Sequence, residues 1–131
     1  MGSSGSRSIH PGIKLKFINT EGFFGPGIAG LFREIDNCGN VREACERCGF
    51  SYSKGWKIIR RCERELGCDL VDRQAGGHSG GTARVTDKGH DLLAAYEELL
   101  SELESVAEDR FAGLMKKYGL DEDGMTGVRK E

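Results

Sequence analysis

The sequence predicts a mainly α-helical domain that carries a small β-hairpin wing and continues into a long C-terminal helix. Three observations support this fold class. Apolar residues recur at helical spacing in three consecutive segments between residues 26 and 66. Two short apolar segments then flank a glycine-rich stretch, residues 74–82, as the strands of a hairpin flank its tip. A last amphipathic segment runs from residue 87 to about residue 118. This order is that of a winged helix-turn-helix followed by a long dimerisation helix.

Length and composition bound the domain organisation. The chain has 131 residues, of which 37% are hydrophobic and 31% charged, enough for one compact core. No apolar run approaches the ~20 residues needed to cross a bilayer, so no membrane association is predicted. We expect four parts: a disordered leader or cloning remnant at 1–12, a winged helix-turn-helix at 13–86, a dimerisation helix at 87–118 and a flexible tail at 119–131.

The first elements are a short strand and a helix. Ile13–Phe17 alternates apolar and basic side chains, which is the period of a half-buried strand. The first helix is predicted to begin at Pro26, because proline is favoured at the first helical position, and to end at Cys38-Gly39. Its apolar side has helical spacing and consists of Ile28, Leu31, Phe32 and Ile35.

Two further helices follow closely. Asn40 and Glu43 resemble a capping box, which predicts a short helix over residues 41–48. Ser51 can cap a third helix that runs to Leu66. Two helices joined by such a short turn form a helix-turn-helix, whose second member would be the recognition helix.

The wing and the last helix complete the predicted fold. Asp69–Arg73 and Ala83–Val85 indicate two strands, and the glycines between them suggest a mobile tip. Thr86 can cap the fourth helix, with Asp87 in the first turn, where a negative charge meets the positive end of the helix dipole.

The third helix has two chemically different sides. Its predicted core side consists of Gly55, Ile59, Cys62 and Leu66. Its far side is wholly basic and carries Lys54, Lys57, Arg60, Arg61 and Arg64. Like charges at this spacing repel, so the pattern makes sense if an external polyanion compensates the repulsion. Residues 1–86 carry a net charge of +4 and residues 87–131 a net charge of −6, so only one end suits a polyanion.

Roles are expected to divide along the third helix. The N-terminal turn of a recognition helix meets base edges in the major groove, so the base-reading candidates are Ser51, Tyr52, Ser53, Lys54 and Lys57. The candidates for phosphate contacts lie further along the helix and in the wing: Arg60, Arg61, Arg64, Arg73, His78 and Arg84. Trp56 flanks the core side, and we expect it to pack as an anchor with its N–H hydrogen-bonded.

The fourth helix is predicted to form a homodimer. It is too long for a core of this size to cover, so its far half needs a partner. The predicted interface consists of Leu92, Tyr96, Leu99, Leu100, Leu103, Val106 and Phe111. Two such helices about a two-fold axis would place the recognition helices roughly 34 Å apart, one turn of DNA.

Five stretches carry a resemblance to a known family: VREACERCGF (41–50), SYSKGW (51–56), LGCDLVDR (66–73), GGHSGGTARVT (76–86) and DKGHDLL (87–93). From about Phe24 to Leu100, the chain resembles the N-terminal domain of ModE-type molybdate-responsive regulators and, more distantly, the helix-turn-helix of LysR-type regulators. The resemblance implies a dimeric winged helix that binds a palindromic operator. It does not imply molybdate sensing, because the chain ends where such regulators begin a separate oxyanion-binding domain.

We therefore expect a cytoplasmic transcriptional regulator that binds double-stranded DNA, and neither an enzyme nor a cofactor-binding protein. Two alternatives stay open. Cys45 and Cys48 have the spacing of zinc ligands, so the chain could be a metal- or redox-responsive regulator, although both cysteines lie on the packing side of their helix. The winged helix could also serve only protein–protein contacts, in which case its binding would be insensitive to salt.

Overall fold

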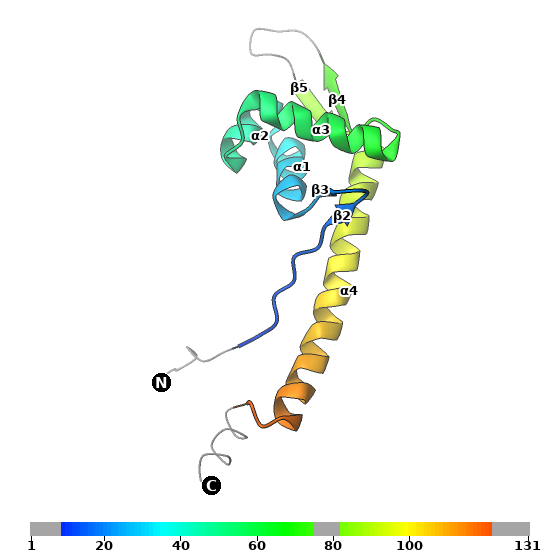
Figure 1. The fold of residues 1–131 in the computed structure, drawn as a ribbon. Helices are drawn as coiled ribbons and strands as arrows, with labels where there is room; N and C mark the ends of the chain where they lie inside the picture. Colours follow the sequence, from blue (N-terminus) through cyan, green and yellow to red (C-terminus); the bar gives the residue numbers. More distant parts are fainter. Residues whose placement is uncertain (1–8, 75–81, 122–131) are drawn as a thin grey trace. The chain divides into compact units, whose positions relative to one another are not determined.

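The computed structural model describes residues 9–74 and 82–121 (Figure 1). It contains two compact units, Lys14–Glu98 and a second unit that joins Met1–Ile13 with Leu99–Glu131. The elements, in chain order, are β2 (Phe17–Ile18), β3 (Gly22–Phe24), α1 (Pro26–Cys38), α2 (Val41–Cys48), α3 (Tyr52–Leu66), β4 (Val71–Gln74), β5 (Thr82–Val85) and α4 (Asp87–Lys117). The mainly helical fold class with a small antiparallel hairpin and a long C-terminal helix is confirmed.

The first three helices have the predicted bounds because their ends are set by local hydrogen bonds. The side chain of Asn40 accepts the backbone N–H of Glu43 at 2.8 Å and caps α2. The hydroxyl of Ser51 accepts the backbone N–H of Lys54 at 3.2 Å and caps α3. Gly39 ends α1 in the left-handed conformation with φ of 70°, which glycine adopts without steric cost.

The predicted first strand is wrong in its extent. Residues 13–16 alternate between half-buried and exposed, as expected, but β2 begins only at Phe17, which pairs with Phe24 of β3. The reason is a side chain: the backbone carbonyl of Leu15 accepts a hydrogen bond from the hydroxyl of Tyr96 at 2.9 Å. The carbonyl of Leu15 therefore bonds to α4 and not to a neighbouring strand.

An aromatic cluster forms the centre of the domain core. The rings of Phe17, Phe24 and Phe32 meet in successive contacts with centroids 5.8 and 5.7 Å apart. The ring of Tyr96 lies edge-on to Phe24 at 5.2 Å and to Phe17 at 5.4 Å. This cluster attaches the first half of α4 to the helices and strands that precede it.

Two residues of the predicted dimer interface belong to this core instead. Tyr96 is 1% exposed and Leu92 is 8% exposed within the single chain. The helical periodicity of α4 groups them with Leu99 and Leu103, but the first three turns of α4 are covered by the domain itself. Side chains that are buried in the monomer cannot also face a partner.

The bounds of both wing strands differ from the prediction: the first strand begins two residues later, and the second begins one residue earlier. β4 starts at Val71 and β5 at Thr82, in a register that pairs Val71 with Val85. The backbone N–H groups of Leu70 and Val71 donate to the carboxylate of Glu63 on α3, at 2.9 and 3.2 Å. These bonds fix the base of the wing against α3. The predicted wing tip, including His78, lies outside the described residues.

The start of α4 is clamped against the wing. The hydroxyl of Thr86 accepts the backbone N–H of Gly89 at 3.0 Å, so Thr86 caps the helix as predicted, and it donates to the carbonyl of Asp69 at 2.7 Å. α4 runs to Lys117, one residue short of the predicted end. Among the helices of residues 9–74 and 82–121, none is long and apolar enough to cross a membrane.

Gly89 provides a test of this packing. A Cβ added at Gly89 would collide with the carbonyl oxygen of Leu70 and with a methyl group of Val85. We expect Gly89→Ala to lower the free energy of unfolding by about 2 kcal/mol, because neither the backbone nor the packed valine can move freely. Gly113→Ala, where nothing lies within 4 Å of an added Cβ, is the matched control and should not lower it. Denaturant unfolding of both variants checks the prediction. A Gly89→Ala variant as stable as Gly113→Ala would contradict it.

Candidate nucleic-acid interface

The two sides of α3 are confirmed as core and solvent sides. Gly55, Ile59 and Cys62 are buried. Leu66, which the helical pattern placed on the core side, is 42% exposed because it stands at the last turn of the helix. The side chains that the structure leaves exposed on the opposite side are Ser53, Lys54, Lys57, Arg60 and Arg64.

An open hollow lies on this solvent side. It is lined by Ser53, Trp56, Lys57, Arg60, Arg61 and Arg64. Four of these six residues are cationic, and none is acidic. The hollow therefore presents positive charge over a surface that polar and aromatic side chains also shape.

Arg61 departs from the predicted role. Its guanidinium lies 3.6 Å from a carboxylate oxygen of Glu21 and 3.6 Å from one of Glu65, and its side chain is only 32% exposed. It sits on the flank of α3, where the β2–β3 turn supplies Glu21. Arg61 is thus half-buried and has two acidic neighbours, whereas Arg64 is exposed and has no ion pair among the described residues.

Arg60 remains available despite a nearby acid. Its closest carboxylate oxygen, on Glu63, is 4.0 Å away, and its side chain is 62% exposed. Glu63 is only 14% exposed, and its other oxygen already accepts the two backbone N–H groups at the base of the wing. The carboxylate of Glu63 is therefore committed to holding the wing, a role that the sequence did not reveal.

The base-reading candidates are not equally available for contacts with DNA. Ser53, Lys54 and Lys57 are exposed, whereas the oxygen of Ser51 already caps the helix. Tyr52 is half-buried, and its ring lies under the guanidinium of Arg42, 4.1 Å from the ring centroid.

Arg42 is a cation that the sequence reasoning missed. It is exposed in the first turn of α2 and stacks on the first turn of α3. The sequence did contain a signal for this role. Arg42 lies two residues after the helix cap at Asn40, and the N-terminus of a helix attracts anions such as phosphate.

The wing strands carry two more arginines, of which Arg73 lies against α3 and Arg84 lines a second hollow. Arg84 is exposed, and its guanidinium lies 3.7 Å from the carboxylate of Asp72 on the paired strand. The guanidinium of Arg73 lies 5.2 Å from the centroid of the Trp56 ring. Trp56 itself differs from expectation: its buried ring N–H has no hydrogen-bond partner among the described residues.

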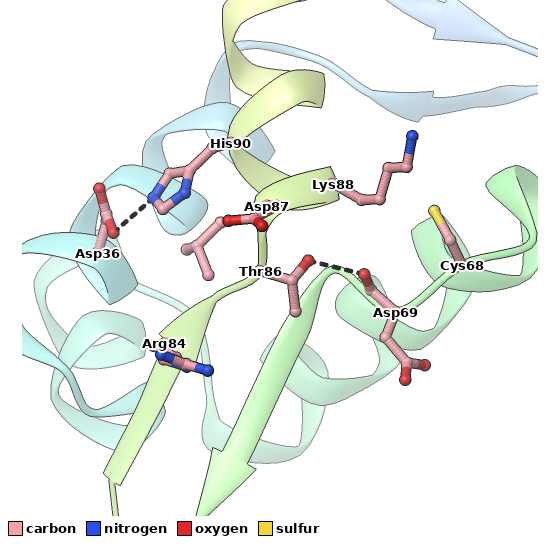
Figure 2. Close-up of a pocket in the computed structure, with 9 residues that line it drawn as sticks. Asp36, Cys68, Asp69, Arg84, Thr86, Asp87, Lys88 and His90 are labelled. Carbon is pink, nitrogen blue, oxygen red and sulfur yellow. Dashed lines mark hydrogen bonds and ion pairs between the residues drawn. The ribbon is translucent and has the colours of Figure 1, made fainter.

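A second hollow lies at the start of α4, and its charges are mixed. Figure 2 shows the charged and titratable side chains that line it: Asp36, Asp69, Asp87, Arg84, Lys88 and His90. A ring nitrogen of His90 lies 2.9 Å from a carboxylate oxygen of Asp36, and this contact joins α4 to α1. The mixed signs suit a structural junction better than a nucleic-acid surface.

The second half of α4 exposes apolar side chains. Leu99, Leu103, Val106 and Leu114 are 41%, 39%, 60% and 37% exposed, respectively. Leu100 and Phe111 are half-buried. From residue 99 onward the helix thus carries an apolar stripe that the described part of this unit leaves in solvent.

The cysteines pack as small apolar side chains. Burial raises the pKa of Cys45, and the neighbouring thiol of Cys48 raises it further. Partial burial also raises the pKa of Cys48, helped by the negative charge of Glu34. A raised pKa disfavours the thiolate, which is the form that binds zinc or attacks disulfides. Within residues 9–74 and 82–121, no group of three potential ligands is placed to hold a metal ion.

Thiol labelling tests this interpretation. Burial raises the pKa of Cys62 to about 12, and Cys45 is 1% exposed, so neither thiol should react at pH 8 in the folded chain. The half-buried thiols of Cys38, Cys48 and Cys68 should react before these two. We expect Cys45 and Cys62 to label only at the rate of unfolding, as mass spectrometry of the labelled peptides would measure. Rapid labelling of Cys45 in native conditions would show a reactive thiol and contradict the packing role.

A family model and several curated proteins are similar to this chain. A family model described as the bacterial regulatory helix-turn-helix protein of the lysR family matches residues 30–90. The transcriptional regulator ModE of Haemophilus influenzae is 29% identical over 77 residues, which cover 59% of this chain and 30% of that protein. The DNA-binding transcriptional dual regulator ModE of Escherichia coli K12 is 30% identical over 87 residues, 66% of this chain and 33% of that protein. The chain thus spans about a third of the curated relatives it matches.

A solved structure agrees with the fold. The crystal structure of the CbnR_DBD-DNA complex has a TM-score of 0.50 and 24% identity, and the likeness covers 66% of this chain and 93% of that one. The family match spans most of α1, all of α2 and α3, the wing and the start of α4. Residues 30–90 are therefore similar to the regulatory helix-turn-helix of the lysR family, and the chain is similar to about a third of the length of ModE regulators.

Proposed function

We propose that this chain binds double-stranded DNA sequence-specifically as a homodimer and thereby regulates transcription. The observation that carries the proposal is the exposed basic side of α3, where Lys54, Lys57, Arg60 and Arg64 face solvent while the opposite side packs into the core. A helix held in this way can enter a major groove with its cations directed at the DNA.

The exposed residues suggest a division of roles. Ser53, Lys54 and Lys57 lie in the first two turns of α3, the end that reaches base edges in this docking mode. Arg60 and Arg64 lie further along and would bind phosphates, and Arg42 would add a phosphate contact from the start of α2. The wing would add Arg73 and Arg84 beside the same groove, together with the predicted contact of His78.

The exposed apolar stripe of α4 supports the homodimer. The 31 residues of α4 correspond to about 46 Å of helix, and only its first three turns are covered by the domain core. A second copy of this chain supplies the same stripe, so the two can bury each other about a two-fold axis. The interface that we propose consists of Leu99, Leu100, Leu103, Val106 and Phe111.

The proposal describes a binding protein and not an enzyme, working in a reducing cytoplasm. The family match to regulatory proteins supports a binding protein. Five free cysteines fit a reducing compartment. A winged helix used only for protein contacts would not need an exposed side of α3 on which cations are kept apart from acids.

Selection of bound duplexes from a random pool tests the proposal. We expect enrichment of a palindromic site and a steep decrease in affinity with salt, about 0.9 log units per log unit of salt for each neutralised phosphate. Binding that is insensitive to salt would favour protein–protein contacts instead. Steep salt dependence without any enriched sequence would retain DNA binding but contradict sequence specificity.

A further inference from the structure

One aromatic ring connects the recognition helix to the wing. Trp56, on α3, has the guanidinium of Arg60 5.0 Å from its ring centroid. The same ring has the guanidinium of Arg73, on the first wing strand, at 5.2 Å. Two cations from two elements thus lie near the same indole ring, whose π system attracts a cation through its quadrupole.

The surroundings of this pair leave its positive charge largely uncompensated. Arg73 has no ion pair among residues 9–74 and 82–121. The nearest carboxylate oxygen to Arg60 is 4.0 Å away, on Glu63, whose other oxygen holds the base of the wing. The two guanidinium groups share one ring, and of the described carboxylates only that of Glu63 lies within 4.0 Å of Arg60, so a bound anion would add compensating negative charge.

The orientation of the ring points to the same role. A buried tryptophan N–H normally donates to a partner, and the hydrogen bond then fixes the ring. Here the N–H of Trp56 is buried without such a partner among the described residues. The described polar contacts of the ring are therefore those that its π surface makes with the two guanidinium groups.

We propose that Trp56 is a positioning residue that holds Arg60 and Arg73 together as one two-guanidinium clamp for a DNA backbone phosphate, between α3 and the wing. This inference rests on the proposed function. A guanidinium that stacks on a ring with its flat face still has its N–H donors free along its edges. Those donors match the oxygens of a phosphate. Because the ring already restricts the long arginine side chains, they would lose less conformational entropy when they bind a phosphate.

A double-mutant cycle on duplex affinity tests the clamp. We expect Trp56→Leu to weaken binding about five-fold and Arg73→Gln by a similar factor. Because both changes break the same clamp, the double variant should lose much less than the product of the two factors. Arg64→Gln is the matched control, since Arg64 is exposed on the same side of α3 and makes no cation–π contact among the described residues. Its effect should multiply with that of Trp56→Leu. Trp56→Phe keeps an aromatic ring and should bind within about two-fold of the unmutated chain.

Fluorescence gives a second readout that does not depend on Trp56→Leu folding. Trp56 is the single tryptophan of the chain, so its emission reports directly on the clamp. We expect Arg73→Gln to change the emission of the free protein, and to reduce the change that duplex DNA causes in the unmutated chain. Arg64→Gln should leave the emission of the free protein unaltered.

The outcomes separate the two proposals. Salt-dependent duplex binding together with independent, multiplying effects of Trp56→Leu and Arg73→Gln would overturn the clamp and leave the proposed function intact. An emission spectrum indifferent to Arg73→Gln would do the same. Failure of the unmutated chain to bind any duplex would overturn the proposed function, and the clamp with it.

Discussion

The double variant Arg60→Ala, Arg64→Ala is expected to bind duplex DNA about 100-fold more weakly than the unmutated chain. Each charge-assisted contact is worth about 1.5 kcal/mol or more, and a loss of 1.4 kcal/mol is ten-fold in affinity. The slope of log affinity against log salt should fall by about 1.8, since two phosphates are no longer neutralised. Fluorescence anisotropy with a labelled duplex at four salt concentrations measures both quantities.

Arg61→Ala is the matched control for this prediction. It removes the same charge from the same helix, but the guanidinium of Arg61 is already shared by Glu21 and Glu65. We expect its affinity to stay within about two-fold of that of the unmutated chain, and its salt slope to stay within about 0.3. Changes of this size are usual for residues that do not contact the ligand. A salt slope unchanged in the double variant, or one that falls as much in Arg61→Ala, would contradict the assignment of phosphate contacts.

The second large effect is expected from Leu103→Glu combined with Val106→Glu. Both side chains are exposed in the apolar stripe of α4, and two glutamates would place four like charges in a two-fold interface. We expect a monomer by analytical ultracentrifugation at micromolar concentration, where the unmutated chain is a dimer. Binding to a duplex with two half-sites should fall about 100-fold, because the second half-site is no longer reached by a linked domain.

Ser101→Glu is the control for the stripe. It adds one glutamate per chain on the opposite side of α4 at an exposed position, and the dimer should persist. Affinity for a duplex with a single half-site should be equal in all these variants, because α3 is unchanged. A dimer that survives the two glutamates would contradict the proposed interface and would place the two-fold contact elsewhere on the chain.

Much of the fold could be predicted because it is encoded in short segments. The caps of α2 and α3, at Asn40 and Ser51, lie three residues from the backbone N–H groups that they accept. The buried side of α3 follows from helical periodicity alone. The comparisons agree with this fold, since a lysR-family helix-turn-helix model matches residues 30–90 and a solved DNA-binding domain has a TM-score of 0.50.

Other features depended on contacts between residues far apart in the chain. The hydroxyl of Tyr96 binds the carbonyl of Leu15, 81 residues away, and this contact both shortens the first strand and removes Tyr96 from the predicted dimer interface. Arg61 has a second acidic neighbour besides Glu65 of its own helix because the β2–β3 turn brings Glu21 beside it. No local pattern distinguishes these cases.

The sequence by itself determined where the helices begin and end and which side of α3 is charged, since caps and periodicity act over a few residues. Only the tertiary structure decided which of those charges stay exposed, that Glu63 fastens the wing, and that Arg73 meets Arg60 at the ring of Trp56. The physical reason is that burial and pairing depend on what lies across space from a side chain, and helical spacing carries no information about that.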